Sequence, residues 1–544
     1  MKPVMLPAIA FCLTAALSAG QPQAPVPEKQ THIRGRIVSA ETGQPLARAR
    51  VALLSAVTPG RPLMTTSTNS QGNYDLRDVP PGSYFVAAAR SGYLELQYGQ
   101  RRARERGLSV EVKQGESIGR IDIALARGGV VAGHVVDENG EPYAGVMITV
   151  WQMRYQQGRR VPFPSGTERT DDLGAYRIPG LQPGTYTVSG LSTETWRNEK
   201  SETLGYASTY YPGATIDQAQ PITIEPGQQR TTLDFALVAA RTSRLRGRVT
   251  RPTGEPVSGE SVTLAPSIRG TGLTFVTGAP ISTRTGADGS FELRDVPPGT
   301  YALRGNVGRN ETHSIPVDVE GDIDNLLLVP RSGSTVTGVV VTDTGEPPPF
   351  PASGARLSLL APEPERVLPT VRVPAINSDW SFTLSNVGGP FLFRLSGFPE
   401  AWMIDSVQLN DDDFTDVPWD VPTGARQISG LRIVITKEVA TIDGSVVTSK
   451  GTPTADAIVV VFPDDERQWM FGSRFVRTAR PTTEGRYSIS GLPAGEYLVV
   501  AEQELMDGEW ESREFLKRVA TRAARVTLPR GASKSLDVRV ASSR

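Results

Sequence analysis

Val131-Ala132-Gly133-His134-Val135 begins the stretch of sequence that decides the fold, and it continues through Gly140-Glu141-Pro142 and Gly174-Ala175-Tyr176 to Pro183-Gly184-Thr185-Tyr186. In a strand, successive side chains point to opposite faces, so the two valines and the central glycine of the first segment share one face. The apolar residues predict that this face is buried. A glycine on a buried face predicts that a bulky group lies directly across from it.

The segments between these strands predict tight turns. Gly140 follows Asn139, and Asn-Gly is the strongest short signal for a hairpin. A turn glycine supplies positive φ, and Pro142 blocks further ladder pairing just beyond the turn. The pattern is therefore one of short strands joined by tight turns.

The same pattern occurs five times along the chain, with looser spelling in some copies. Its first-strand glycines are Gly35, Gly133, Gly247, Gly338 and Gly444. The repeat is longer than the twenty to fifty residues of solenoid units, so each copy is long enough to bury its own core. Copy four has Phe382 and Phe391 where other copies have tyrosines, which indicates that these rings serve first as core anchors.

Composition agrees with a multidomain β protein. The 544 residues include 54 Gly and 43 Pro, and the 57 basic residues nearly balance the 58 acidic ones. A nucleic-acid-binding protein would show a clustered basic excess, so we expect no nucleic-acid partner. We predict a signal peptide at 1–20, a linker at 21–31 and β-sandwich domains at 32–127, 128–240, 241–330, 331–438 and 439–544.

The first twenty residues have the features of a secretory signal. Lys2 supplies the positive end, residues 4–17 an apolar stretch, and residues 18–20 a small-residue cleavage site. Cys12, the one cysteine, lies inside this segment, so we expect core packing rather than disulfides to hold the mature domains. No later apolar run approaches the roughly eighteen residues of a membrane span. We expect an exported protein, periplasmic or extracellular.

The repeated motifs resemble those of the carboxypeptidase regulatory-like domain. The resemblance covers essentially the whole mature chain and implies an all-β fold: a tandem array of five Greek-key β-sandwich domains similar to prealbumin. In metallocarboxypeptidases this module follows a catalytic domain and is itself inert. The same fold family includes glycan-binding modules and surface-protein stalks, and the fold alone does not choose between them. Because only a few residues separate the copies, we expect a straight rod of five domains.

The motifs that suggest catalysis have simpler explanations. None of His32, His134 and His313 is followed three residues later by glutamate, as a zinc carboxypeptidase requires, and His134 occupies an outward strand position. The sequence Gly115-Glu116-Ser117-Ile118-Gly119 matches a nucleophile elbow, but it lies before a final strand rather than between a strand and a helix. We predict no enzyme activity, no metal site and no cofactor.

Two charged runs are open to more than one interpretation. Residues 411–416 concentrate aspartates but lack the glycine of a helix-loop-helix calcium loop, so a solvated loop is favoured. Residues 101–106 form a dense basic cluster, for which we weigh a solvated loop against contact with an acidic polymer.

Aromatic residues in the longer loops are the remaining candidates for a binding site. They either stack on sugar rings or cap the open ends of the sandwich cores. The candidates for glycan stacking are Trp196, Tyr210, Tyr211, Trp402 and Trp419, and copy five adds Trp469 and Trp510 in similar positions. Our leading hypothesis is an exported, non-catalytic scaffold or spacer that contacts envelope or extracellular proteins. The alternative is a carbohydrate-binding protein with a polysaccharide partner.

Overall fold

The computed structural model describes residues 31–55, 62–100, 107–267, 280–308, 310–363, 366–368, 371, 373, 375–399, 401–503 and 505–540. The expected signal peptide, residues 21–30 of the expected linker and the basic run at 101–106 lie outside the described residues. Strands dominate the described part of the chain, which confirms the all-β class, and their sheets fall into five successive groups that we call units 1 to 5.

Units 1 and 2 contain the first twenty-one strands. Unit 1 comprises β1 (His32–Ser39), β2 (Arg50–Ser55), β3 (Met64–Ser67), β4 (Asn73–Arg77), β5 (Gly82–Ala89), β6 (Leu96–Gln97), β7 (Val110–Val112), β8 (Ser117–Ile118) and β9 (Ile123–Leu125). Unit 2 comprises β10 (Gly129–Val136), β11 (Met147–Gln156), β12 (Arg159–Arg169), β13 (Ala175–Leu181), β14 (Gly184–Leu191), β15 (Thr195–Arg197), β16 (Thr203–Tyr206), β17 (Thr209–Tyr210), β18 (Ile222–Ile224), β19 (Gln229–Arg230), β20 (Phe235–Ala236) and β21 (Ala239–Arg241), with the 3-10 turn η1 (Ile216–Gln218).

Units 3 to 5 follow the same order. Unit 3 comprises β22 (Ser243–Val249), β23 (Ser261–Pro266), β24 (Ile281–Arg284), β25 (Ser290–Val296), β26 (Gly299–Val307), β27 (Glu311–Val319), β28 (Ile323–Leu328) and β29 (Arg331–Ser332). Unit 4 comprises β30 (Ser334–Thr342), η2 (Ala352–Gly354), β31 (Arg356–Leu360), β32 (Ser381–Val387), β33 (Gly389–Ser396), β34 (Met403–Leu409), β35 (Asp412–Asp413), β36 (Trp419–Val421) and β37 (Gln427–Thr436). Unit 5 comprises β38 (Ala440–Val447), β39 (Ile458–Pro463), η4 (Glu466–Gln468), β40 (Arg477–Ala479), β41 (Arg486–Leu492), β42 (Gly495–Glu502), η5 (Glu509–Glu511), α1 (Arg513–Ala520), β43 (Ala524–Leu528), β44 (Ser533–Ser535) and β45 (Val538–Arg539).

Each unit contains a two-sheet sandwich with one recurring topology, and unit 2 adds a third sheet of order β15-β16-β21. In unit 1, β1 lies between antiparallel β4 and the parallel final strands β8 and β9, while the second sheet has the order β3-β2-β5-β6, with β7 also paired to β5. Units 2, 3 and 5 repeat this arrangement, and unit 4 extends its first sheet with β34 and β35. Each unit encloses its own apolar core.

The first-strand glycine is explained by the last strand of its unit. A Cβ on Gly133 would overlap the carbonyl oxygen of Leu233, and the hydroxyl of Tyr176 donates a hydrogen bond to that same oxygen at 2.8 Å. The predicted bulky group is therefore a backbone carbonyl. All five first-strand glycines face such a carbonyl, and the hydroxyl bond is repeated in units 1 and 5, whereas units 3 and 4 have phenylalanine there.

The tyrosine of Pro-Gly-x-Tyr closes a corner of the backbone. The Tyr186 hydroxyl donates to the carbonyl of Gln182, four residues earlier, at 2.6 Å, and the same bond occurs in units 1, 3 and 5. This is the hydrogen bond of a tyrosine corner. Tyr186 is almost wholly buried, which confirms that the ring is a core anchor.

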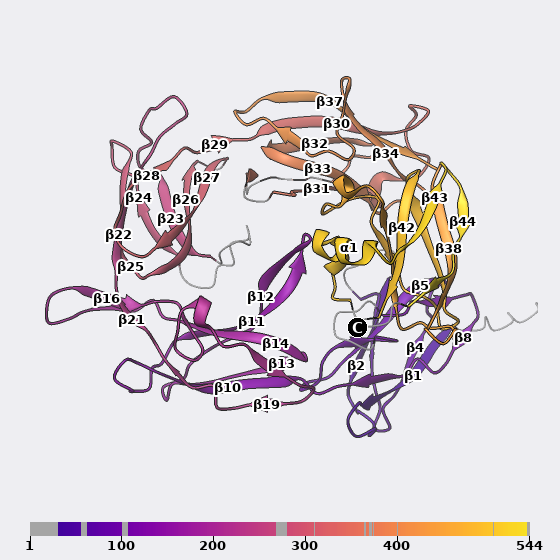
Figure 1. Cartoon of the computed structure of the whole chain (residues 1–544), viewed down its shortest axis with the longest axis horizontal. Coiled ribbons are helices and arrows are strands. Elements are labelled where there is room, and N and C mark those ends of the chain that lie inside the picture. Colours follow the sequence, from indigo (N-terminus) through magenta and orange to yellow (C-terminus); the bar gives the residue numbers. More distant parts are fainter. Residues whose placement is uncertain are drawn as a thin grey trace, which may run out of the picture.

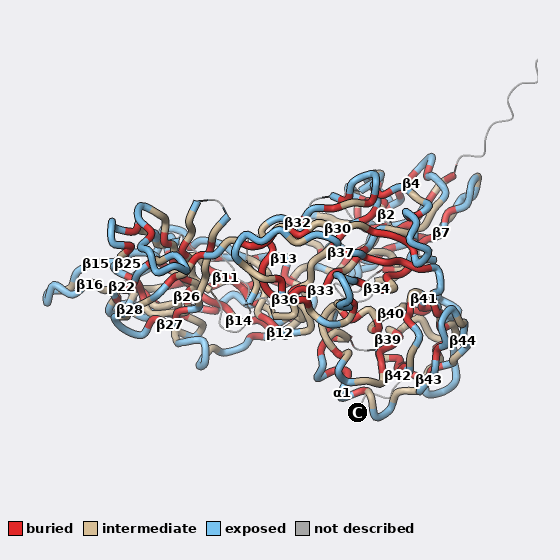
Figure 2. Tube along the Cα trace, turned by 90° about the horizontal axis from the view of Figure 1, so that it is seen from above, coloured by how far each residue is buried: buried red, intermediate tan, exposed pale blue. Residues whose placement is uncertain are grey.

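The units are arranged in a ring, which shows that the predicted straight rod is wrong. Figure 1 shows the five units following one another around a ring, and Figure 2 shows that the ends of this ring overlap, with unit 1 above unit 5. The first and last strands of each unit run parallel, so consecutive units are joined end to end. Short connections restrict the angle between neighbours, but contacts between the units decide whether that angle is straight or bent.

A partly buried ion-pair network joins units 4 and 5. Arg474 of unit 5 donates to both carboxylate oxygens of Asp416 at 2.9 to 3.1 Å and to the carbonyl of Ile404 at 2.8 Å. Arg394 of unit 4 donates to the carbonyl of Gly472 in unit 5 at 2.7 Å. Burial lowers the pKa of Arg394 to about 10, which shows how far this cation is removed from water.

Unit 5 differs from the others because it has a second core. Helix α1 and η5 lie between β42 and β43 and cover the outer face of the β39–β42 sheet. Phe515 and Leu516 pack there against Phe462 and Val500. Strands β39 and β42 are therefore buried on both faces, which is why they contain nearly continuous apolar runs.

Candidate functional site

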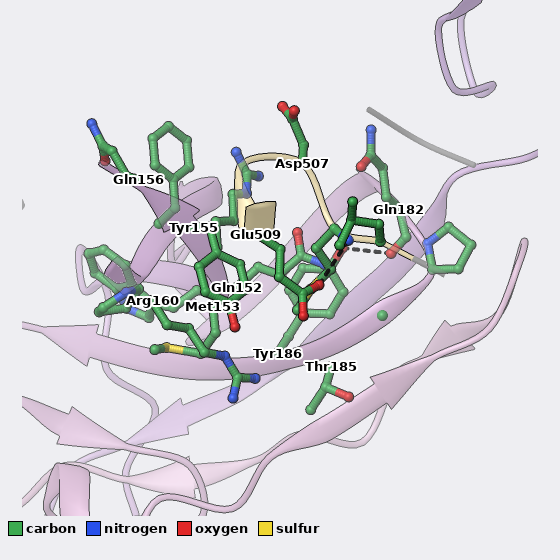
Figure 3. A pocket seen from close by; sticks show the side chains of 18 of the residues that line it. Gln152, Met153, Tyr155, Gln156, Arg160, Gln182, Thr185, Tyr186, Asp507 and Glu509 are labelled. Atoms are coloured by element: carbon green, nitrogen blue, oxygen red, sulfur yellow. Dashed lines mark hydrogen bonds between the residues drawn. The ribbon is translucent and has the colours of Figure 1, made fainter. Parts of the chain in front are cut away.

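A pocket of about 1750 Å³ lies where units 1, 2 and 5 meet. Strands β11, β12 and β14 of unit 2 supply much of its wall. Unit 1 adds Leu94, Leu96 and Ala126, and unit 5 adds residues 456–458, 478–480, 503, 505–507, 509 and 510. Figure 3 shows side chains of unit 2 together with Asp507 and Glu509 of unit 5 around this space. The pocket therefore exists only because the ring brings unit 5 back to the first two units.

The β11–β12 hairpin positions the unit 2 wall. Its turn residues Gln157 and Gly158 both have positive φ, at 52° and 68°, as in the type I′ turn that matches the twist of paired strands. The hairpin points into the ring toward α1 (Figure 1). At its tip, a Cβ on Gly158 would lie 2.6 Å from the carbonyl oxygen of Glu511 in unit 5. Arg159 donates to the carbonyl of Pro362 in unit 4 at 3.2 Å.

Six aromatic rings contribute to the pocket lining: Trp151, Tyr155, Phe163, Tyr186, Tyr210 and Trp510. Two of them are held in place by hydrogen bonds. The Trp151 Nε1 donates to the Ser189 hydroxyl at 2.8 Å, and Tyr186 forms the corner described above. Tyr155 and Trp510 are half-buried, one on each side of the seam between units 2 and 5.

The charged residues of the lining balance in number. They are three arginines, Arg154, Arg160 and Arg480, and three acids, Asp456, Asp507 and Glu509. Glu509 is only 6% exposed and accepts hydrogen bonds from the Arg518 guanidinium at 2.8 Å and from the backbone of Met506 at 3.1 Å. The pocket therefore has no strong preference for an anion or a cation.

Arg154 and Gln156 stand two residues apart on β11. The Arg154 guanidinium lies 4.1 Å from the centre of the Phe163 ring and donates to the Ser165 hydroxyl at 2.9 Å. Among the described residues, however, neither Arg154 Nε nor Gln156 Oε1 has a hydrogen-bond partner, although both atoms are buried. An unsatisfied buried donor or acceptor is costly, so each needs an explanation.

Burial raises the pKa of Tyr155, and the negative charge of Glu509 raises it further. Burial alone raises the pKa of Tyr210. Both phenols are therefore neutral at ordinary pH, and each presents a ring face together with a hydroxyl. Ring faces, amides and balanced charges provide for binding of a ligand.

The five aromatic residues singled out from the sequence do not form one site. Tyr210 alone among them lines the pocket, while Tyr211 packs on the unit 2 core. Trp196 also packs on that core, with its ring 4.8 Å from that of Tyr206. These positions correspond more closely to core caps than to an open stacking surface.

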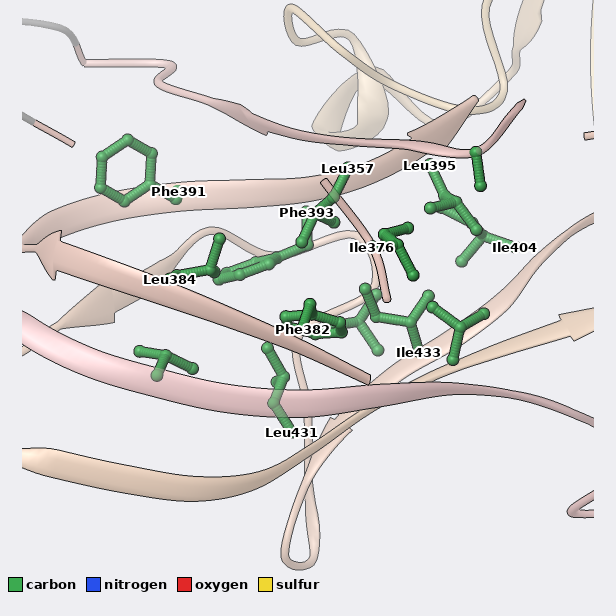
Figure 4. Packing of buried hydrophobic residues seen from close by; sticks show 14 of the residues in the cluster. Leu357, Ile376, Phe382, Leu384, Phe391, Phe393, Leu395, Ile404, Leu431 and Ile433 are labelled. Atoms are coloured by element: carbon green, nitrogen blue, oxygen red, sulfur yellow. The ribbon is translucent and has the colours of Figure 1, made fainter. Parts of the chain in front are cut away.

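Trp402 and Trp419 belong to unit 4. Trp402 is half-buried between Phe350 and the Lys437 ammonium, which lies 5.0 Å from its ring centre. Trp419 is 7% exposed and packs between Phe414 and Phe393 in the core that Figure 4 shows. Neighbouring rings cover Trp419, as they would cover a core cap.

The motifs that resembled catalytic sites have structural partners. His134 is exposed and lies 3.3 Å from the Asp234 carboxylate, and Ser117 forms part of β8, which pairs with β1. Within the described part of the chain, no three His, Cys, Asp or Glu side chains are grouped to hold a metal ion. Residues 411–413 are exposed, as a solvated loop predicts, whereas Asp416 is partly buried and accepts hydrogen bonds from Arg474.

Sequence reasoning missed most of the pocket. The alternation of Trp151, Met153 and Tyr155 with polar residues in β11 was a signal for an extended aromatic face, and Trp510 was noted only as a loop aromatic. Nothing in the spacing showed that these residues meet, since they come from different units. As for membrane contact, no helix among the described residues is both long and apolar enough to cross a bilayer.

Comparison with known proteins gives a family for the chain. No curated protein matches this chain. Among solved structures it is similar to the TIE protein of Bacillus anthracis, with 10% identity, coverage of 96% of this chain and 75% of that one, and a TM-score of 0.16. It is also similar to a streptococcal ancillary pilin, with 12% identity, coverage of 56% of this chain and 99% of the pilin, and a TM-score of 0.21.

The model of the carboxypeptidase regulatory-like domain matches residues 32–126, 130–238 and 244–324. These matches fall on units 1, 2 and 3, and they cover more than half of the chain. Units 4 and 5 repeat the glycine that faces a last-strand carbonyl. The chain therefore belongs to the carboxypeptidase regulatory-like domain family.

Proposed function

We propose that this protein is an exported, non-catalytic scaffold that mediates interactions at the cell envelope or outside the cell. Each unit then acts as a domain, with the boundaries predicted from the sequence except that unit 2 extends to Arg241 through β21 and unit 3 to Ser332 through β29. The observation that carries the proposal is the ring itself. The Arg474–Asp416 network fixes one joint, and the β11–β12 hairpin reaches across to units 4 and 5.

A ring suits a scaffold better than a spacer. A spacer gains reach from a straight array, whereas a ring gives up reach and brings loops of distant units together. Small-angle scattering of residues 21–544 tests this. Five beads about 33 Å wide should have a radius of gyration of about 31 Å in a ring and about 48 Å in a rod. The larger value would favour a spacer.

The non-catalytic part is tested separately. The purified chain is incubated with peptide, ester and glycan substrates, alongside the variants Ser117→Ala and His134→Ala. We expect no turnover by any of the three proteins. Turnover that either substitution abolishes would overturn the proposal.

The second candidate function is carbohydrate binding. The observation that favours it is the position of Tyr210 in a pocket whose lining contains five further aromatic rings. Native affinity electrophoresis through gels that contain soluble polysaccharides is the test, and retardation by at least one of them is the expected result.

A further inference from the structure

We propose that the pocket between units 1, 2 and 5 binds a neutral oligosaccharide, and that binding requires the closed ring. The inference rests on the second candidate function above and gives it a site. It moves the binding surface away from four of the five loop aromatics, since Tyr210 alone among them lines this pocket.

The composition of the wall indicates the class of ligand. Sugar rings carry apolar C–H faces and polar hydroxyl edges, so they pair with aromatic faces and with side chains that both donate and accept. Four of the lining rings are partly exposed, those of Tyr155, Phe163, Tyr210 and Trp510, and the pocket adds the amides of Gln152, Gln156 and Gln182. A purely apolar ligand would leave these amides unpaired, which is costly in a buried site.

Charge argues for a neutral ligand. Three arginines and three carboxylates contribute to the lining, so the lining has no excess of either charge. A polyanion such as a nucleic acid or an acidic glycan would need a clear basic excess.

The unsatisfied polar atoms of β11 add a second observation. Arg154 Nε is a donor and Gln156 Oε1 an acceptor, and both lie in side chains of the pocket wall. A hydroxyl group donates and accepts, so hydroxyls of one ligand satisfy both atoms after small rotations of these side chains. Neither atom has a hydrogen-bond partner among the described residues.

Size indicates an oligomer. The volume of about 1750 Å³ exceeds the roughly 300–1,000 Å³ of pockets for drug-sized ligands, so several sugar rings fit. Because three units build the wall, an open ring would divide the binding surface. A bound ligand therefore stabilises the closed ring by mass action.

The experiment uses the full mature chain and four neutral probes: cellohexaose, maltohexaose, mannohexaose and xylohexaose. Trp151 and Trp510 line the pocket, so binding is followed by tryptophan fluorescence. Hexagalacturonate is the charged comparison, and an uncharged proline-rich peptide tests the other ligand that aromatic grooves accept.

Two pocket variants and one matched control locate the site. Thr185→Trp adds bulk at an exposed position of the wall, so the fold should tolerate it, and Tyr155→Ala removes a ring at the seam. Trp196→Ala removes a ring outside the pocket. We expect at least one neutral hexasaccharide to bind. Both pocket variants should weaken it about tenfold or more, and the control should not. Scattering of Tyr155→Ala shows whether its ring is still closed.

Each other outcome overturns a definite claim. Sugar binding lost in Trp196→Ala and kept in Thr185→Trp would place the site on the loop aromatics and refute the pocket. Binding of hexagalacturonate or of the peptide alone would refute the ligand class. Absence of any sugar binding, in gels as well as in solution, would refute carbohydrate binding and leave the scaffold proposal standing.

Discussion

Replacing Asp416 by alanine should loosen the joint between units 4 and 5. The Asp416 carboxylate accepts from Arg474 at 2.9 to 3.1 Å and lies 3.8 Å from the nearest nitrogen of Arg394. The side chains of both arginines are nearly buried, with exposed fractions of 15% and 14%. The substitution therefore leaves two desolvated cations without a counter-charge.

The loss of stability at the joint depends on the hydrogen bonds that the two arginines keep. Removing one partner of a buried ion pair costs about 3–5 kcal/mol. Arg474 keeps the carbonyls of Ile404 and Asp405, and Arg394 keeps those of Gly472 and Thr415. We therefore expect the lower end, about 3 kcal/mol, and roughly a hundredfold faster amide exchange at the joint.

The assay is native-state hydrogen exchange of the whole chain, read by mass spectrometry over β34 and residues 470–476. Asp420→Ala is the control, because Asp420 pairs with Arg366 at 2.9 Å while 63% exposed, and an exposed pair contributes about 1 kcal/mol at most. Equal exchange in the two variants would show that the network does not hold the joint.

Three further predictions concern the tyrosines and the hairpin. Tyr176→Phe removes the hydrogen bond to Leu233 and should lower the free energy of unfolding by about 1 kcal/mol, which urea unfolding of unit 2 would reveal. Burial raises the pKa of Tyr74 and Tyr176 above the ordinary value of 10.0. The stability that these tyrosines contribute is therefore present below pH 10 and is lost as the pH rises above 10. Midpoints of urea unfolding that stay constant from pH 8 to 11 would contradict this loss of stability. Gly158→Val should push the hairpin off Glu511 and increase the radius of gyration, whereas an unchanged scattering curve would show that the tip does not close the ring.

The repeat and its core were predictable because the decisive contacts lie within one copy. Gly133 predicted that a group lies close to the first strand, and the structure identifies that group as the carbonyl of Leu233. The phenylalanines of copy four indicated core anchors, and Phe382 and Phe391 are buried.

The ring and its pocket were not predictable because they depend on contacts between copies. The Arg474–Asp416 pair joins residues whose sequence context suggests only a surface arginine and a solvated loop. Helix α1 was also missed, although the unbroken apolar run of β39 contradicts a strand with one face in water. In β39, apolar residues occupy both faces instead of alternating with polar ones, and this was the sequence signal that the outer face of the sheet is covered.

The parallel pairing of first and last strands has a consequence for folding during synthesis. Ile37 of β1 pairs with Ile123 of β9, so unit 1 closes only when almost all of it has left the ribosome. The next strand to emerge, β10, carries the same apolar-x-Gly-x-apolar pattern as β1 and competes for the partners of β1. Misassembly between neighbours is a characteristic failure of repeat proteins. Synthesis from the N-terminus favours the correct outcome, because β9 precedes β10 and has already occupied the edge of β1 when its competitor arrives.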